Sequence, residues 1–175
     1  MTTLVFGGMF DPPHIGHVRL LEGAKRHFGE KRALVLVASD PGHREVVASA
    51  LDRLELARAA FPGEDVELDE HPRTVDMLRA RQLEDPTLIL GADELAAFPD
   101  WKEPETVLEL ARLAVGERPG YSVESEWDRV TRFDVEPTPV SSTDIRRRVA
   151  AGESIDGLVS PAVAAEIERL GLYRG

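Results

Sequence analysis

Residues 3–17 read TLVFGGMFDPPHIGH and carry the strongest fold signal in the chain. The apolar run 4–6 predicts a short buried strand, which two glycines end. An Asp-Pro-Pro turn follows, and His14 and His17 then stand at the start of a predicted helix. A strand, a glycine turn and a helix N-terminus make an anion site, because backbone N–H groups and the helix dipole both favour negative charge there. Residues three apart share a helix face, so both histidines can address one bound group.

Apolar patterning predicts that strands and helices alternate along the chain. The predicted strands are 4–6, 33–38, 66–68, 87–90, 113–115 and, as an edge strand, 130–135. The predicted helices are 16–28, 49–61, 74–83, 105–111, 142–150 and 161–170, with a short helix or loop at 94–102. In the helix 49–61, the side chains expected to face the core are Leu51, Leu54, Leu56 and Ala57.

Alternating strands and helices are typical of an α/β domain with a parallel sheet. We expect one domain over residues 1–175, a Rossmann-like doubly wound parallel sheet followed by a C-terminal helical segment. Ligands in such sheets bind at the carboxyl ends of the strands, beside the point where the strand order reverses. Four segments are expected at that edge: 7–17, 39–44, 91–93 and 140–143. Residues 120–127 form the least regular stretch and are expected to be an excursion within the domain.

The composition excludes several classes of protein and site. The 175 residues include no cysteine, so disulfides, thiolate metal sites and a cysteine nucleophile are excluded. A formal net charge of -11 argues against binding of extended DNA or RNA, which needs a basic surface. No stretch approaches the ~20 apolar residues of a membrane span, and the first residues lack the pattern of a signal peptide. We therefore expect a cytoplasmic protein that binds neither nucleic acid nor a membrane.

A second candidate phosphate site lies at residues 140–148, which read VSSTDIRRR. Ser142 and Thr143 stand at the start of a predicted helix, where hydroxyls either cap the helix or bind phosphate oxygens. Arg146 lies one turn further on, where its guanidinium can reach a polyphosphate. Neither candidate site matches the P-loop pattern or the Gly-x-Gly-x-x-Gly fingerprint of dinucleotide-binding proteins.

These two motifs together resemble a known superfamily. GG-x-FDP-x-H-x-GH at 7–17, with SSTDIR at 141–146, is similar to the signature of the nucleotidylyltransferases that carry H-x-G-H. Within that superfamily the chain resembles the nicotinate-nucleotide adenylyltransferase family. The segments that carry this resemblance are PGHR at 41–44, GADELAAFPDW at 91–101, VGERPG at 115–120 and GLYR at 171–174.

The resemblance implies a reaction in which ATP and nicotinate mononucleotide give deamido-NAD and pyrophosphate. The attacking group would be a phosphate oxygen that is already anionic, so the chemistry needs alignment and charge neutralisation more than a strong base. The resemblance places catalytic roles on His14, His17 and Arg146. The ATP-binding residues that it implies are Gly8, Met9, Phe10, His14, His17, Gly91, Asp93, Ser142, Thr143 and Arg146.

The same resemblance places the acceptor on four residues, His43, Arg44, Thr74 and Trp101. Trp101 would stack on the pyridine ring, and Thr74 would lie near the nicotinate carboxylate. His43 and Arg44 would lie on a loop that closes over the mononucleotide. For Trp101, partial burial as a core aromatic is the alternative interpretation.

Three residues depart from the pattern of this family. Met9 stands where many members have Thr or Ser, so this position offers a phosphate only backbone donors. Arg73 and Lys102 stand where tyrosine is found in other members. Positive charge at either position would favour an acceptor that carries a carboxylate over a neutral amide.

The resemblance implies Mg²⁺ together with ATP, and the sequence names no protein ligand for the ion, which phosphates and water can hold. Other activities stay open: an adenylyltransferase acting on nicotinamide mononucleotide or phosphopantetheine, a cytidylyltransferase, or a nucleotide-binding regulator without turnover. Trp101 and the GLYR ending argue against the phosphopantetheine branch. No feature of the sequence sets the oligomeric state.

Overall fold

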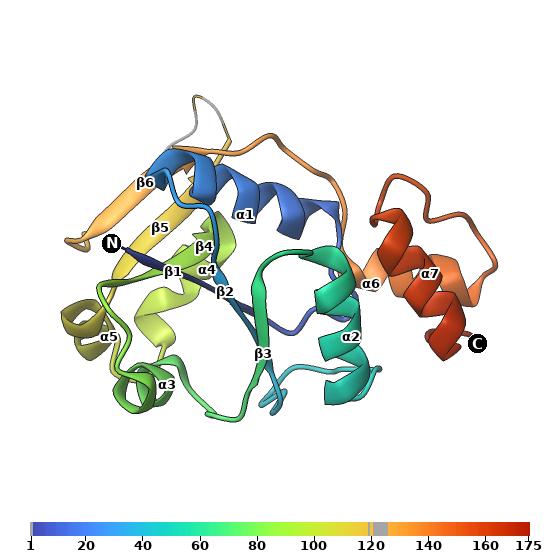
Figure 1. Cartoon of the computed structure of the whole chain (residues 1–175), viewed down its shortest axis with the longest axis horizontal. Helices are drawn as coiled ribbons and strands as arrows, with labels where there is room; N and C mark the ends of the chain where they lie inside the picture. Colours follow the sequence, from blue (N-terminus) through green and yellow to red (C-terminus); the bar gives the residue numbers. More distant parts are fainter. Residues whose placement is uncertain (1, 119, 121–125) are drawn as a thin grey trace.

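The computed structural model describes residues 2–118, 120 and 126–175. In that part of the chain the strands form one parallel sheet of six strands, in the order β3-β2-β1-β4-β5-β6 (Figure 1). The strands are β1 (Thr3–Gly8), β2 (Leu34–Ala38), β3 (Asp65–Asp69), β4 (Pro86–Gly91), β5 (Arg112–Glu117) and β6 (Val130–Asp134). The order reverses between β1 and β4, as it does in doubly wound nucleotide-binding sheets.

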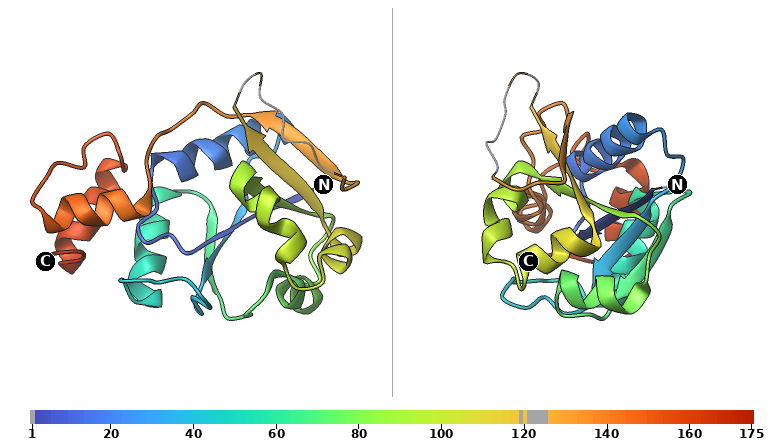
Figure 2. Two further views of the ribbon diagram at one scale, coloured as in Figure 1. Left: turned by 180° about the vertical axis from the view of Figure 1, so that it is seen from behind. Right: turned by 90° about the vertical axis from the view of Figure 1, so that its left-hand side faces the viewer.

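Helices connect the strands and cover both faces of the sheet (Figures 1 and 2). Their bounds are α1 (Ile15–Phe28), α2 (Ala50–Ala60), α3 (Thr74–Arg81), α4 (Ala92–Ala97), the 3₁₀ helix η1 (Phe98–Asp100), α5 (Pro104–Leu110), α6 (Ser142–Ala150) and α7 (Pro161–Leu170). Helices α6 and α7 lie beside α2, at the end of the molecule away from α5 (Figure 1). Among the described residues, no helix has both the length and the apolar character that crossing a membrane requires.

The sequence predicts the architecture correctly. The Rossmann-like doubly wound parallel sheet and the C-terminal helical segment are both confirmed. Strand β6, expected at 130–135 as an edge strand, pairs with β5 at the edge of the sheet. Residues 121–125 of the expected excursion lie outside the described residues, and the single domain over 1–175 stays a prediction.

Side chains of β1 alternate between two hydrophobic cores. Leu4 and Phe6 are buried on the face covered by α1, α2, α6 and α7. Val5 is buried on the opposite face, among side chains of α3, α4 and α5. Because helices cover both faces of the sheet, a ligand can reach the backbone only at the ends of the strands, and in such sheets it binds at the carboxyl ends.

The carboxyl ends of β1, β2 and β4 lie together, because these neighbouring strands run parallel. Three of the four segments expected at this edge lie at these strand ends: 7–17, 39–44 and 91–93. Their expected location at one edge of the sheet is therefore confirmed, next to the point where the strand order reverses.

Helix α2 corrects one prediction from the sequence. Leu51, expected to face the core, is 67% exposed, whereas the other three predicted inward side chains are buried. The buried face of α2 also holds Arg53 and Ala60. At about 100° per residue, the buried residues of α2 share one continuous face of the helix, and Leu51 lies outside that face.

Arg53 is buried because its guanidinium finds carbonyl partners at the edge of the sheet. Its side chain is only 1% exposed. Nε donates to the carbonyl of Ala48 at 3.2 Å, and one terminal nitrogen donates to the carbonyls of Met9 and Ala38 at 3.0 and 2.7 Å. One side chain therefore ties the end of β2, the turn after β1 and the segment before α2 to each other.

Replacing Arg53 by Met should lower the free energy of unfolding by about 3 kcal/mol or more, because several buried carbonyls lose their donor at once. Urea denaturation followed by circular dichroism measures the change. Arg58→Met on the same helix is the matched control, since Arg58 is exposed and its pair with Glu55 contributes less than about 1 kcal/mol. Equal losses for the two variants would contradict the structural role given to Arg53.

Candidate active site

The turn between β1 and α1 is held by an aromatic cluster. Phe10 is buried, with a positive φ of 52°, and its ring lies over Gly8. A Cβ on Gly8 would come within 2.9 Å of that ring, so this position needs glycine. The Phe10 ring also makes edge contacts with Phe6 and Phe61. The side chain of Phe10 thus supports the core, and Phe10 can present only its backbone to a ligand.

His14 and His17 lie together at the start of α1, as predicted. Their rings stack with centroids 3.8 Å apart. Nδ1 of His14 accepts from the backbone N–H of Gly16, and Nδ1 of His17 accepts from the backbone N–H of His14, each at 3.0 Å. A backbone N–H can only donate, so Nδ1 carries no proton in either ring. Each neutral imidazole therefore carries its proton on Nε2 and presents an N–H donor there.

Both histidines are held in the neutral form. Burial lowers the pKa of His14 to about 4, from the ordinary 6.5. Burial, and then the neighbouring His14, lower the pKa of His17 to about 3. At neutral pH the pair therefore offers two uncharged donors, which can hydrogen-bond to phosphate oxygens without a proton transfer.

The second motif reaches the same turn from the C-terminal side. Ser142 Oγ donates to the carbonyl of Pro12 at 2.8 Å. Arg146 donates from one terminal nitrogen to the carbonyl of Asp11 at 2.8 Å, and from the other to Thr143 Oγ1 at 3.3 Å. The structure therefore brings Ser142, Thr143 and Arg146 to the turn that precedes the histidines.

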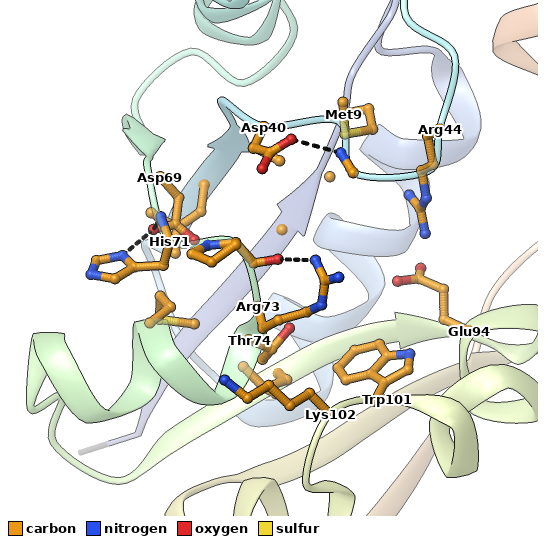
Figure 3. A pocket seen from close by; sticks show the side chains of 18 of the residues that line it. Met9, Asp40, Arg44, Asp69, His71, Arg73, Thr74, Glu94, Trp101 and Lys102 are labelled. Carbon is orange, nitrogen blue, oxygen red and sulfur yellow. Dashed lines mark hydrogen bonds and ion pairs between the residues drawn. The ribbon is translucent and has the colours of Figure 1, made fainter.

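A cavity of about 440 Å³ opens at the carboxyl ends of β1, β2 and β4 (Figure 3). All four predicted acceptor residues line it: His43, Arg44, Thr74 and Trp101. Gly8 and Met9 of the phosphate turn line it as well. His14, His17, Arg146 and Asp93 are not among the described lining residues, so the cavity is one half of the predicted site and the helix N-terminus is the other.

Trp101 is partly buried and also lines the cavity. Its ring lies at the cavity wall and also packs against the second core, with an edge contact to Phe98. Figure 3 shows the indole between the side chains of Lys102 and Glu94. A half-buried aromatic with one exposed face is suited to stacking on a flat ring.

The two basic departures differ in their surroundings. Lys102 Nζ forms an ion pair with both carboxylate oxygens of Asp76, at 3.1 and 3.3 Å. Arg73 donates to the carbonyl of Pro72 at 2.7 Å and, among the described residues, has no carboxylate partner. In Figure 3 its guanidinium points into the cavity, toward the side on which Arg44 lies.

Glu94 and Asp11 are among the site residues that the sequence predictions did not include. Glu94 lines the cavity and accepts from the backbone N–H of Gly91 at 3.3 Å, and burial raises its pKa while Arg44 opposes that rise. A glutamate three residues after a helix N-cap is a recognisable capping signal, so Glu94 was detectable. Asp11 is the other: its buried carboxylate accepts from backbone N–H groups of residues 47–48. No local sequence pattern predicts hydrogen bonds between residues that lie 36 and 37 positions apart.

Comparisons with known proteins agree with this geometry. The Cytidylyltransferase-like family model matches residues 5–148. A probable nicotinate-nucleotide adenylyltransferase of Bordetella avium is 36% identical over 190 residues, which cover 97% of this chain and 96% of that protein. One from Thermus thermophilus is 38% identical over 182 residues, which cover 97% of this chain and 98% of that protein.

This chain belongs to the nicotinate-nucleotide adenylyltransferase family. The membership predicted from the two end motifs and the middle segments is thus confirmed. A solved Plasmodium falciparum nicotinic acid mononucleotide adenylyltransferase complexed with NaAD has a TM-score of 0.81 at 14% identity, over 98% of this chain and 97% of that one. At that identity the likeness supports the shared fold.

The described residues of this family member offer no protein cage for a metal ion. No group of three or more His, Asp or Glu side chains is placed to hold one within residues 2–118, 120 and 126–175. The carboxylate of Asp11 faces the turn but is taken up by hydrogen bonds to backbone and to Tyr173.

Stability should depend on pH through the two histidines. Their folded pKa values lie below the ordinary 6.5, so the unfolded chain binds protons that the folded chain cannot. The contribution of these two histidines to the free energy of unfolding is therefore fully present above pH 6.5, and it falls as the pH drops toward 4. We expect the melting temperature to fall over that window, and to fall less steeply in the variant His14→Asn/His17→Asn. Equal slopes in thermal scans of both proteins would contradict burial as the cause.

Proposed function

We propose that this chain transfers the adenylyl group of ATP to nicotinate mononucleotide, giving deamido-NAD and pyrophosphate. One observation carries the proposal. The turn with His14 and His17 is joined to the helix that carries Arg146 by hydrogen bonds to residues 11 and 12, directly beside the cavity that Trp101 lines. Family membership supports the same reaction.

On the ATP side, the proposed groups act by binding charge. The backbone at Gly8, Met9 and Phe10 would face the phosphates, with the Nε2–H donors of His14 and His17 beside it. Ser142, Thr143 and Arg146 would hold the β and γ phosphates. Gly91 and Asp93, at the start of α4, would contact the adenosine.

The chemical step is a displacement at the α-phosphorus of ATP. A phosphate oxygen of the mononucleotide forms a bond to that phosphorus, and the bond to the β,γ-pyrophosphate breaks. The nucleophile is already an anion, so no proton has to be removed. The neutral imidazole donors stabilise charge as the phosphorus becomes pentacoordinate, and the turn aligns the two anions.

Mg²⁺ is proposed to enter with ATP, held by phosphate oxygens and water. Its contribution when bound is to neutralise phosphate charge. The substrates proposed here are small molecules of the cytoplasm, and we propose that location for the protein.

Release of pyrophosphate tests the reaction against its alternatives. We expect release with ATP and nicotinate mononucleotide, and much weaker release with CTP or with phosphopantetheine. Preference for CTP would support a cytidylyltransferase. Nucleotide binding without release from any acceptor would support a regulator.

His17→Asn should lower kcat by about 10²–10³, because Asn keeps an acceptor near the position of Nδ1 but lacks the Nε2–H donor. His17→Gln, which places a donor near the position of Nε2, is the matched variant and should lose less. Steady-state kinetics gives the rates, and circular dichroism checks that both variants fold. Near-normal turnover of His17→Asn would remove His17 from the chemistry.

We further propose that Arg73 selects the acid form of the acceptor. Of the two basic departures, Lys102 already pairs with Asp76, whereas the Arg73 guanidinium faces the cavity without a carboxylate partner among the described residues. A carboxylate on the pyridine ring would supply that partner, and a neutral amide would not.

Arg73→Gln should lower the preference for nicotinate over nicotinamide mononucleotide by about tenfold or more, the value of one charged hydrogen bond. The ratio of kcat/KM for the two acceptors measures it. Lys102→Gln is the control and should leave the ratio unchanged. An equal loss with both acceptors in Arg73→Gln would show that Arg73 binds their shared phosphate instead.

A further inference from the structure

The carboxylate of Asp11 lies between groups from distant parts of the chain. It is 3% exposed. Oδ1 accepts from the hydroxyl of Tyr173 at 2.7 Å and from the backbone N–H of Ala48 at 3.1 Å. Oδ2 accepts from the backbone N–H of Val47 at 2.7 Å and lies 4.0 Å from a terminal nitrogen of Arg146. The carboxylate is thus turned toward three shorter contacts, and its approach to the guanidinium is the longest of the four.

Arg146 uses the main chain of Asp11 instead of its carboxylate. The same terminal nitrogen donates to the Asp11 carbonyl at 2.8 Å, and the other donates to Thr143 Oγ1 at 3.3 Å. Both acceptors are neutral. The guanidinium is oriented by them and has N–H groups left for an anion, and among the described residues its one carboxylate neighbour, Asp11 Oδ2, lies 4.0 Å away, beyond hydrogen-bond distance.

The turn at the end of helix α7 directs the side chain of Tyr173 toward Asp11. The helix stops at Gly171, which has φ 65°, and the N–H of Leu172 bonds back to the carbonyl of Ile167 at 3.0 Å. Tyr173 itself has φ 62°, a conformation that few side chains adopt. This turn sends the ring inward, where it is 7% exposed. Burial and the bond to Asp11 raise the pKa of Tyr173, so the hydroxyl stays protonated and donates.

We propose that Tyr173 is a positioning residue, which holds the Asp11 carboxylate away from Arg146 and so keeps the guanidinium available for the phosphates of the nucleotide. The inference rests on the proposed function, which places Arg146 on those phosphates. Without the hydroxyl, Oδ1 loses its shortest contact, and the nearest charged donor to the carboxylate is Arg146 at 4.0 Å. Closing that gap would turn this distant ion pair into a directly hydrogen-bonded one, which competes with the ligand.

A double-mutant cycle tests the inference, with MgATP affinity measured by isothermal titration calorimetry. Tyr173→Phe keeps the ring and removes only the hydroxyl. We expect it to weaken ATP binding about tenfold, the scale of one charge-assisted hydrogen bond. In an Arg146→Ala background the same change should cost nothing further, because the residue through which it acts is gone.

A second background provides the control. Trp101 lies in the acceptor cavity and packs against Phe98, on the opposite side of the sheet from the core that holds Tyr173. In Trp101→Ala, Tyr173→Phe should therefore keep its full tenfold cost. Circular dichroism and thermal scans of each variant check that the fold is retained.

Three results would overturn the positioning role. They are wild-type ATP affinity in Tyr173→Phe, an unreduced cost of Tyr173→Phe in the Arg146→Ala background, and no effect of Arg146→Ala itself. Pyrophosphate release by the wild-type protein tests the proposed reaction separately. If that release fails, the proposed reaction is wrong, and the ATP-affinity cycle still decides whether Tyr173 acts through Arg146.

Discussion

Two buried charged side chains, Asp11 and Arg53, hold the edge of the sheet on which the site is built. Asp11 accepts from the backbone at 47–48, and Arg53 donates to the carbonyls of Met9, Ala38 and Ala48. Burying a charge is costly unless nearly all of its hydrogen bonds are made. The turn after β1, the end of β2 and the segment before α2 therefore keep one relative arrangement.

That arrangement divides the site into two parts with different physical properties. The part proposed to bind phosphates is a helix N-terminus with stacked neutral histidines, backed by the buried ring of Phe10. The part proposed to bind the acceptor is a cavity of about 440 Å³ lined by charged side chains and by Trp101. In the proposed reaction two anionic substrates meet between these parts. The position of the turn after β1 therefore matters more for aligning the reacting atoms than the strength of any one contact.

Most of the secondary structure and part of the candidate site could be predicted from the sequence. Apolar runs and helical periodicity predicted the strands and helices, because burial on both faces leaves a strong local pattern. The prediction for Leu51 is wrong because hydrophobicity does not mark an arginine as inward, and the buried face of α2 includes Arg53. The four residues predicted to form an acceptor pocket all line one cavity: His43, Arg44, Thr74 and Trp101.

The sequence by itself determined the parallel α/β fold, the turn with two histidines at the start of α1 and the family, because each leaves a signal within a short window of residues. Only the tertiary structure decided which basic side chains of the cavity form an ion pair among the described residues and which do not. It paired Lys102 with Asp76 and left Arg73 facing the cavity. It also set the hydroxyl of Tyr173 on a carboxylate 162 positions earlier in the chain. Such partners are chosen by the packing of whole elements, and no local pattern encodes that choice.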